Sequence, residues 1–196
     1  MKVIALALLL FTAGCKKDGT GEQGTGIPVD VAGVNALVPA ALKDKLVFEQ
    51  RELVDDFGSK TTKFTLAAPK GWKHEERAVG VQLDSPGTAL GFGTEMKLGK
   101  DCDGLCESKN WAEVFDKRVK GMDGKVQKDV KGATNRLVIT ESLFGGSTKT
   151  ELVFAWWGED QPQYWTCTVR LDDEAKAALP AFEKACQGVG LMVTRD

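Results

Sequence analysis

Hydrophobic and polar residues alternate along several stretches of the chain, a pattern typical of β-strands that have one buried face. The predicted strands, in chain order, cover residues 46–55, 61–67, 78–84, 88–97, 125–130, 133–144, 148–157 and 164–171. Short turns rich in Gly, Ser and Pro separate neighbouring stretches. We therefore expect the first two strands, the next two, and the pair joined by Gly145-Gly146-Ser147 to form hairpins.

Helical periodicity is clearest over residues 110–121. Asn110 and Glu113 resemble a capping box at its start, and Gly121 stops the pattern. A last helix is expected over about 173–187, where Pro180 either kinks the helix or marks its first turn. A short helix follows Pro39. In the stretch 110–121, Trp111, Val114, Phe115 and Val119 are apolar and, together with Arg118, recur at helical spacing.

These elements predict an α+β protein with one folded domain over residues 28–196. We find no internal repeat and no second domain boundary. The sequence has 26 basic and 28 acidic residues and a formal net charge of −2. This balance gives no electrostatic argument for nucleic-acid binding or for a polybasic membrane-binding patch.

The first fifteen residues have the composition of an export signal. Lys2 precedes nine apolar residues, 3–11, a run too short to span a bilayer. The following residues, Phe11-Thr12-Ala13-Gly14-Cys15, resemble the lipobox of bacterial lipoproteins, with Thr12 where Leu or Val is usual. The resemblance implies that residues 1–14 are a signal peptide and that Cys15 is lipidated and becomes the mature N-terminus. The alternative is an ordinary secretory signal followed by an unrelated cysteine.

Residues 15–27 are expected to form the lipidated cysteine and a flexible tether. Positions 16–26 (KKDGTGEQGTG) contain no apolar side chain, so they cannot offset the entropy of ordering. Lys16 rather than Asp follows the cysteine. By resemblance to Gram-negative sorting, this favours anchoring to the outer membrane, with the body facing the periplasm.

Four cysteines remain after Cys15, and an even number in an exported chain predicts two disulfides with three possible pairings. Cys167 alternates onto the apolar face of strand 164–171, and Cys186 lies on the apolar stripe of the next helix. A helix that folds back on its preceding strand brings these faces together. We therefore favour Cys167–Cys186, which leaves Cys102–Cys106 as a local ring. The alternatives are a four-cysteine metal site and, more weakly because the spacing is not C-x-x-C, thiol redox chemistry.

The sequence contains no recognisable catalytic motif. His74 is the only histidine and lies in a charged stretch read as a solvated loop, so no Ser-His-Asp or Cys-His device can be built. The acidic residues around Cys102, which are Asp101, Asp103 and Glu107, lack the spacing of an EF-hand loop. No cofactor or metal is predicted.

An aromatic group at residues 156–165 is the candidate contact for a partner. It contains Trp156, Trp157, Tyr164 and Trp165. Adjacent strand residues point to opposite faces, so one of the first two rings faces away from the other. We predict Trp157 and Tyr164 as partner contacts, the alternative being that helices bury these rings in the core.

Residues 64–72, Phe64-Thr65-Leu66-Ala67-Ala68-Pro69-Lys70-Gly71-Trp72, resemble the strand, proline and Gly-Trp opening of PsbP-like and DcrB-like domains. The long strand pair 133–157, strand 164–171 and the closing helix are similar to the C-terminal half of that family. The resemblance implies a curved antiparallel sheet with helices packed on both faces. It also implies a non-enzymatic accessory module that binds an envelope protein, and it assigns no site residue. The alternatives are a carrier of lipid or another small ligand, which needs an apolar cavity, and, less favoured, an envelope hydrolase.

Overall fold

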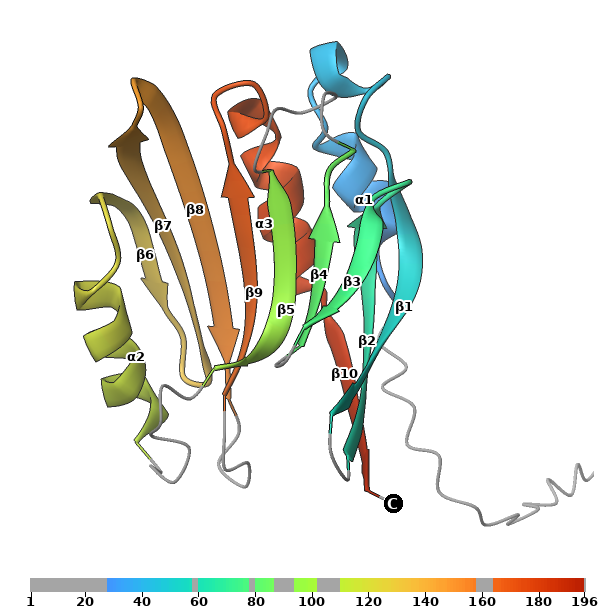
Figure 1. Cartoon of the computed structure of the whole chain (residues 1–196), viewed down its shortest axis with the longest axis vertical. Helices are drawn as coiled ribbons and strands as arrows, with labels where there is room; N and C mark the ends of the chain where they lie inside the picture. Colours follow the sequence, from blue (N-terminus) through green and yellow to red (C-terminus); the bar gives the residue numbers. More distant parts are fainter. Residues whose placement is uncertain are drawn as a thin grey trace, which may run out of the picture.

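The computed structural model describes residues 28–57, 60–77, 80–86, 94–101, 110–157 and 164–195. Antiparallel sheet dominates this part of the chain, with a few helices around it, in agreement with the predicted α+β class (Figure 1). The proposed signal peptide and tether, Cys102 and Cys106 lie outside the described residues.

The larger sheet has seven strands in the order β3-β4-β5-β9-β8-β7-β6. Its strands are β3 (Lys73–Arg77), β4 (Gly80–Asp84), β5 (Glu95–Asp101), β6 (Lys125–Lys131), β7 (Asn135–Phe144), β8 (Ser147–Trp156) and β9 (Tyr164–Leu171). Both edge strands, β3 and β6, expose every side chain, and both are rich in charged residues. Charged edges are a common protection against unwanted strand pairing between molecules.

The smaller sheet has the order β1-β2-β10, with strands β1 (Phe48–Phe57), β2 (Lys60–Pro69) and β10 (Gly190–Arg195). The β1–β2 pair confirms the first predicted hairpin, and the β7–β8 pair confirms the one joined by two glycines. β10 was not predicted. β10 is the C-terminal strand of the described chain, and it pairs with β2, more than a hundred residues earlier in the sequence.

Three further predictions need correction. The predicted strand 88–97 lies partly outside the described residues, and β5 (Glu95–Asp101) extends beyond its predicted end, because it pairs with β9 along that length. The stretch read as a loop around His74 is strand β3, which pairs with β4. The short helix after Pro39 is only a 3₁₀ turn, η1 (Ala40–Leu42), and an unpredicted helix, α1 (Val31–Ala36), precedes it.

The remaining helices are α2 (Trp111–Lys120), η2 (Lys176–Ala178) and α3 (Leu179–Gln187). α2 agrees with its prediction, although its cap differs: the Asn110 side-chain amide donates to Glu113 Oε2 (2.7 Å) and does not accept from the helix backbone. Pro180 lies in the first turn of α3, so it marks the start of the helix rather than a kink.

The main core lies among β1, β2, α1, α3 and the apolar face of strands β4, β5 and β9. Large rings dominate it. Phe182 of α3 contacts Phe48 and Trp72, with ring centroids 5.2 Å and 5.8 Å away, and Phe64 meets Trp165 edge-on at 5.7 Å. Edge-on ring pairs add to the stabilisation from burial. Trp165, Cys167, Val169 and Leu171 all belong to this core, as the alternation along β9 predicted.

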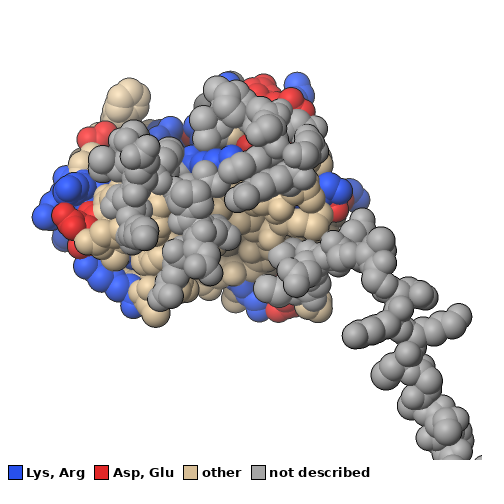
Figure 2. Space-filling view, turned by 90° about the horizontal axis from the view of Figure 1, so that it is seen from below, with Lys and Arg blue, Asp and Glu red and all other residues tan. Residues whose placement is uncertain are grey.

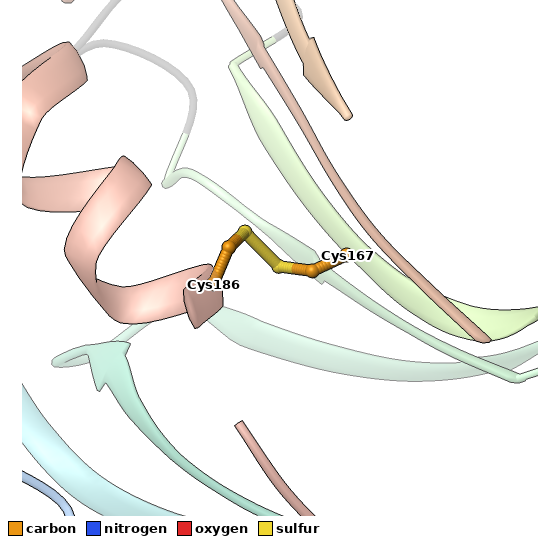
Figure 3. The surroundings of a disulfide bond; sticks show 2 residues. All are labelled: Cys167 and Cys186. Atoms are coloured by element: carbon orange, nitrogen blue, oxygen red, sulfur yellow. A yellow bond between two sulfur atoms is a disulfide. The ribbon is translucent and has the colours of Figure 1, made fainter. Parts of the chain in front are cut away.

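A disulfide joins Cys167 of β9 to Cys186 of α3, with the Cα atoms 5.5 Å apart (Figure 3). This confirms the favoured pairing of these two cysteines. Both are fully buried within the main core. The bridge therefore fixes the helix to its preceding strand where the two apolar surfaces already meet.

A second apolar cluster, the α2 cluster, forms where α2 packs on strands β7, β8 and β9. Along β8, Leu152 belongs to the main core and Val153 to the α2 cluster, as the two-residue period of a strand requires. This cluster is much smaller than the main core. Its buried members are Trp111, Val114, Phe115, Val138, Val153, Ala155 and Tyr164.

Candidate functional site

Of the two predicted aromatic contacts, Tyr164 is wrong. Its side chain is 0% exposed, and its ring meets the rings of Trp111 and Phe115 at 5.7 Å and 5.8 Å. The physical reason is that α2 lies over this end of β9 and takes Tyr164 into its cluster. Tyr164 is thus a core residue, in agreement with the alternative that helices bury these rings.

Trp157 is partly buried at the end of β8, where it packs against the α2 cluster. Its N–H donates to the Thr134 carbonyl oxygen (2.9 Å), and its ring lines a small hollow of about 60 Å³. A hollow of this size holds only a water molecule or two. Trp157 therefore has a packing role, and its role as a partner contact stays a prediction.

Beside Trp157, a network of charges fastens α2 to strands β6 and β7. Arg136 is buried and donates from Nε and Nη2 to both carboxylate oxygens of Asp129, each at 2.8 Å. It also donates to Asp116 of α2, and its guanidinium lies 5.6 Å from the Phe115 ring centroid. The hydrogen bonds from Arg136 lower the pKa of both Asp116 and Asp129 below the usual range, and Lys131 adds to the effect at Asp116. This arrangement is a structural fastening.

The most exposed large apolar residues of the described chain lie at the turn between β7 and β8. Leu143 is 81% exposed and Phe144 is 76% exposed. Gly145 and Gly146 follow with φ of 60° and 84°, the positive values that a tight two-residue hairpin turn requires. We call Leu143, Phe144, Gly145 and Gly146 the tip. A regular hairpin thus holds two apolar side chains in solvent with no packing role in the fold.

One face of the tip borders an open hollow of about 430 Å³, which we call the tip groove. Its volume is within the range of roughly 300–1,000 Å³ usual for ligand sites. Phe144 supplies its apolar wall, and most of the remaining lining is polar. The lining residues that matter here are Thr140, Ser142, Phe144, Lys149, Glu151 and Arg170.

Arg170 holds two carboxylates across the floor of the tip groove. Its Nη1 donates to Glu95 Oε1 (3.1 Å) and its Nε to Glu151 Oε1 (3.3 Å). Glu95 also accepts from Lys97 Nζ (2.7 Å), so the ion pairs cross three neighbouring strands, β5, β9 and β8. These pairs order the polar floor, while their partial exposure limits their effect on stability.

Glu95 also lines a second hollow of about 490 Å³ farther along the same sheet. We call this hollow the basic groove. Its lining includes Arg77, Gln82, Lys97, Arg118, Thr166 and Thr168. On the end of the molecule seen from below, blue and red atoms are interspersed around the rim (Figure 2). On this face, the visible charges of both signs alternate rather than forming one broad field.

Sequence reasoning missed the tip. The sequence predicts Leu143 and Phe144 as the last residues of strand 133–144, and they are the last residues of β7, directly before the double-glycine turn. Their exposure was not predicted. Turn-flanking positions are normally polar, so two large apolar residues there were a usable signal. The polar floors of the grooves gave no signal, because cross-strand register decides which polar residues meet.

Among the described residues, no group of three or more His, Cys, Asp and Glu side chains could hold a metal ion. His74 is exposed on edge strand β3. No helix within the described ranges is both long and apolar enough to cross a membrane. No protein-family model matches the chain, and no curated protein matches it at a significant level.

Proposed function

We propose that the chain is a lipoprotein anchored through Cys15 and that its body is a non-enzymatic accessory module that binds another envelope protein. The anchor rests on the apolar run 3–11 followed by Ala13-Gly14-Cys15. The tip supports the proposal that the body binds another protein. Partner-binding surfaces concentrate their energy in a few large side chains, often aromatic, and Phe144 is such a side chain held in solvent by an ordered hairpin.

The position of the tip favours a protein partner over the anchoring membrane. The described body starts at Pro28, three residues before α1, and α1 and β1 lie on the right of Figure 1. The β7–β8 turn lies at the upper left of the same view, on the other side of the molecule. When the Pro28 side faces the membrane, the tip is presented away from it, toward other components of the envelope.

We further propose that the helices cover opposite faces of the curved larger sheet, α3 on one and α2 on the other, as the resemblance to PsbP-like and DcrB-like domains implies. The alternation of Leu152 and Val153 between the two apolar clusters supports this arrangement. The pairing of β7 with β8 continues to Phe144 and Ser147, so the hairpin is ordered up to its turn. A rigid contact residue loses less entropy on binding than a mobile one.

The carrier alternative needs an apolar cavity between sheet and helix, and the rings of Phe48, Trp72 and Phe182 occupy that space instead. A hydrolase would need convergent polar groups around a nucleophile. His74 lies on an edge strand with its neighbours exposed. The packed rings argue against an apolar carrier cavity at this place, and the exposed position of His74 gives no support to a hydrolase centre.

The anchor is tested by fractionating cells that express the wild-type precursor or Cys15→Ser. The wild type should sediment with membranes, and its N-terminal peptide should carry acyl mass on Cys15. The Cys15→Ser protein should stay soluble or remain unprocessed. An unmodified Cys15 in the wild type, or cleavage at another residue, contradicts the lipoprotein assignment.

The contact is tested with the double variant Leu143→Ala/Phe144→Ala against Val130→Ala, which truncates another exposed apolar residue, on edge strand β6. Both proteins should unfold like the wild type. After crosslinking in intact envelopes, the tip variant should lose the crosslinked species, and Val130→Ala should keep it. Equal yields from both variants would contradict the tip as the contact.

A further inference from the structure

We infer that the basic groove is a binding site for carboxylate groups. The groove lies over strands β4, β5 and β9, and its polar lining residues on these strands share one face of the sheet. Cross-strand register places Gln82, Lys97 and Thr168 in one row, and Gly99 opposite Thr166 in the next. Gly99 has no side chain, so this row leaves open space above β5.

The floor of the groove is polar. Thr166 and Thr168 are 7% and 8% exposed, and both line the groove. Gln82 lines it beside them and donates from Nε2 to Asp84 Oδ1 (2.6 Å). Hydroxyl groups on the floor of an open hollow are donors that an anion in the hollow can accept from.

The walls of the groove are cationic. Arg77 extends from β3, where it pairs with Glu75 (2.8 Å), Lys97 from β5 and Arg118 from α2, while Glu95 is the acidic residue among the lining side chains. A guanidinium has five donors, so one ion pair does not exhaust those of Arg77. Lys100 is also a lining residue, but its ammonium lies 5.4 Å from the Trp165 ring centroid and is not counted here. Ammonium and guanidinium groups above hydroxyl and amide groups form the donor set that recognises a carboxylate.

Glu95 shows how a carboxylate is held at the edge of the groove. It bridges Lys97 and Arg170 at 2.7 Å and 3.1 Å, so the site already stabilises one carboxylate there. A second carboxylate, from a ligand, can share the cationic side chains of the lining. The groove is also large enough for a small ligand or a short extended segment, at about 490 Å³.

Two sources share this chemistry: Asp or Glu side chains on a segment of another protein, and a small free acid. This inference stands apart from the proposed tip contact, because it concerns different residues and a different ligand chemistry. The probes are a labelled, end-capped peptide with two glutamates between glycines, the same peptide with glutamines, and free glutarate. Binding is measured on the mature full-length protein in non-ionic detergent.

The glutamate peptide should bind at least tenfold more tightly than the glutamine peptide, the ratio expected when charge-assisted hydrogen bonds are lost. Lys97→Gln should weaken its binding by about tenfold or more, and Thr168→Val, which keeps the shape of the side chain, by about threefold. Lys63→Gln is the matched control, because Lys63 pairs with Glu52 on the smaller sheet. It should leave binding unchanged, as should the tip variant.

Tighter binding of the peptide than of glutarate identifies a protein segment as the source, and the reverse identifies a small acid. Both results support carboxylate recognition. Equal affinity for the two peptides overturns the inference. It is equally overturned if Lys63→Gln weakens binding as much as Lys97→Gln, or if Thr168→Val and Lys97→Gln both fold normally and bind like the wild type.

Discussion

The main core and the α2 cluster both bury apolar side chains from strands β8 and β9, yet they differ in what surrounds them. The main core combines several ring contacts with a buried disulfide and has the smaller sheet beside it. The α2 cluster is small and held by one buried arginine, and the same face of the sheet continues into polar, open grooves. We therefore expect the main core to provide most of the stability. We expect contacts with other molecules on the side of the α2 cluster and the grooves.

The sequence of β9 explains why the main core and the α2 side of the larger sheet differ. Its odd-numbered residues, including Trp165, Cys167 and Val169, are apolar and face the main core. Its even-numbered residues change from Tyr164 through two threonines to Arg170, so burial decreases along the strand on that side. One strand thus serves the core with one face and the candidate sites with the other.

The largest effect should come from Phe182→Ala. The ring is fully buried and contacts Phe48 and Trp72, so its loss leaves a cavity in the main core. We expect the free energy of unfolding to fall by about 3–5 kcal/mol. Urea denaturation of the variant checks this. A loss below about 1 kcal/mol would place the stability of the domain elsewhere and break the comparison.

Removing the disulfide with Cys167→Ala/Cys186→Ala should cost about 3 kcal/mol, since the closed loop has a sequence separation of 19. Both sulfur atoms belong to buried residues, so the native protein should resist mild reduction. Denaturation with and without reductant measures both effects. Peptide mapping that finds Cys167 bonded to Cys102 or Cys106 would contradict the pairing.

The charge network on α2 predicts how stability depends on pH. Arg136 lowers the pKa of Asp116 and Asp129 in the folded protein. A lowered pKa contributes stability that is complete above the unfolded value, near 4, and is lost as the pH falls through the folded values. Arg136→Met should therefore flatten the stability profile below about pH 4. Lys63→Met, at a surface pair, is the control and should keep the slope; if the two profiles match, the network is not the cause.

Trp157→Ala tests whether Trp157 stabilises the fold or contacts a partner. The ring is partly buried against the α2 cluster, so its truncation should cost about 1–2 kcal/mol, less than a fully buried ring. Crosslinking to a partner should persist, because the tip lies at the other end of β8. Thermal unfolding and crosslinking yield test the two halves separately. Unchanged stability with lost crosslinking would restore Trp157 as the contact.

The sequence predicted best where both residues of a contact lie close along the chain. The hairpins and the Cys167–Cys186 bridge follow from local alternation and one helix turning back on its strand. β10 was missed because its partner β2 is remote in sequence. β3 was missed because an exposed edge strand has no apolar face and therefore no alternation to detect.

The candidate site was harder to predict, for two reasons. The aromatic group at 156–165 is visible in the sequence, but the sequence does not reveal that α2 covers Tyr164. Phe144 looked like an ordinary strand residue, because exposure at a turn depends on where the strand ends. Burial of one ring and exposure of another are properties of tertiary packing, which single-sequence periodicity does not determine.

The most direct test of the tip as a contact places a photoreactive phenylalanine analogue at position 144 in the full-length, membrane-anchored protein. The same analogue at position 130, an exposed valine on edge strand β6, is the matched control. Irradiation of intact cells should give a discrete crosslinked protein from position 144 and little or none from position 130. Crosslinks to lipid alone from position 144, or the same products from both positions, would contradict the proposal that the tip binds a protein partner.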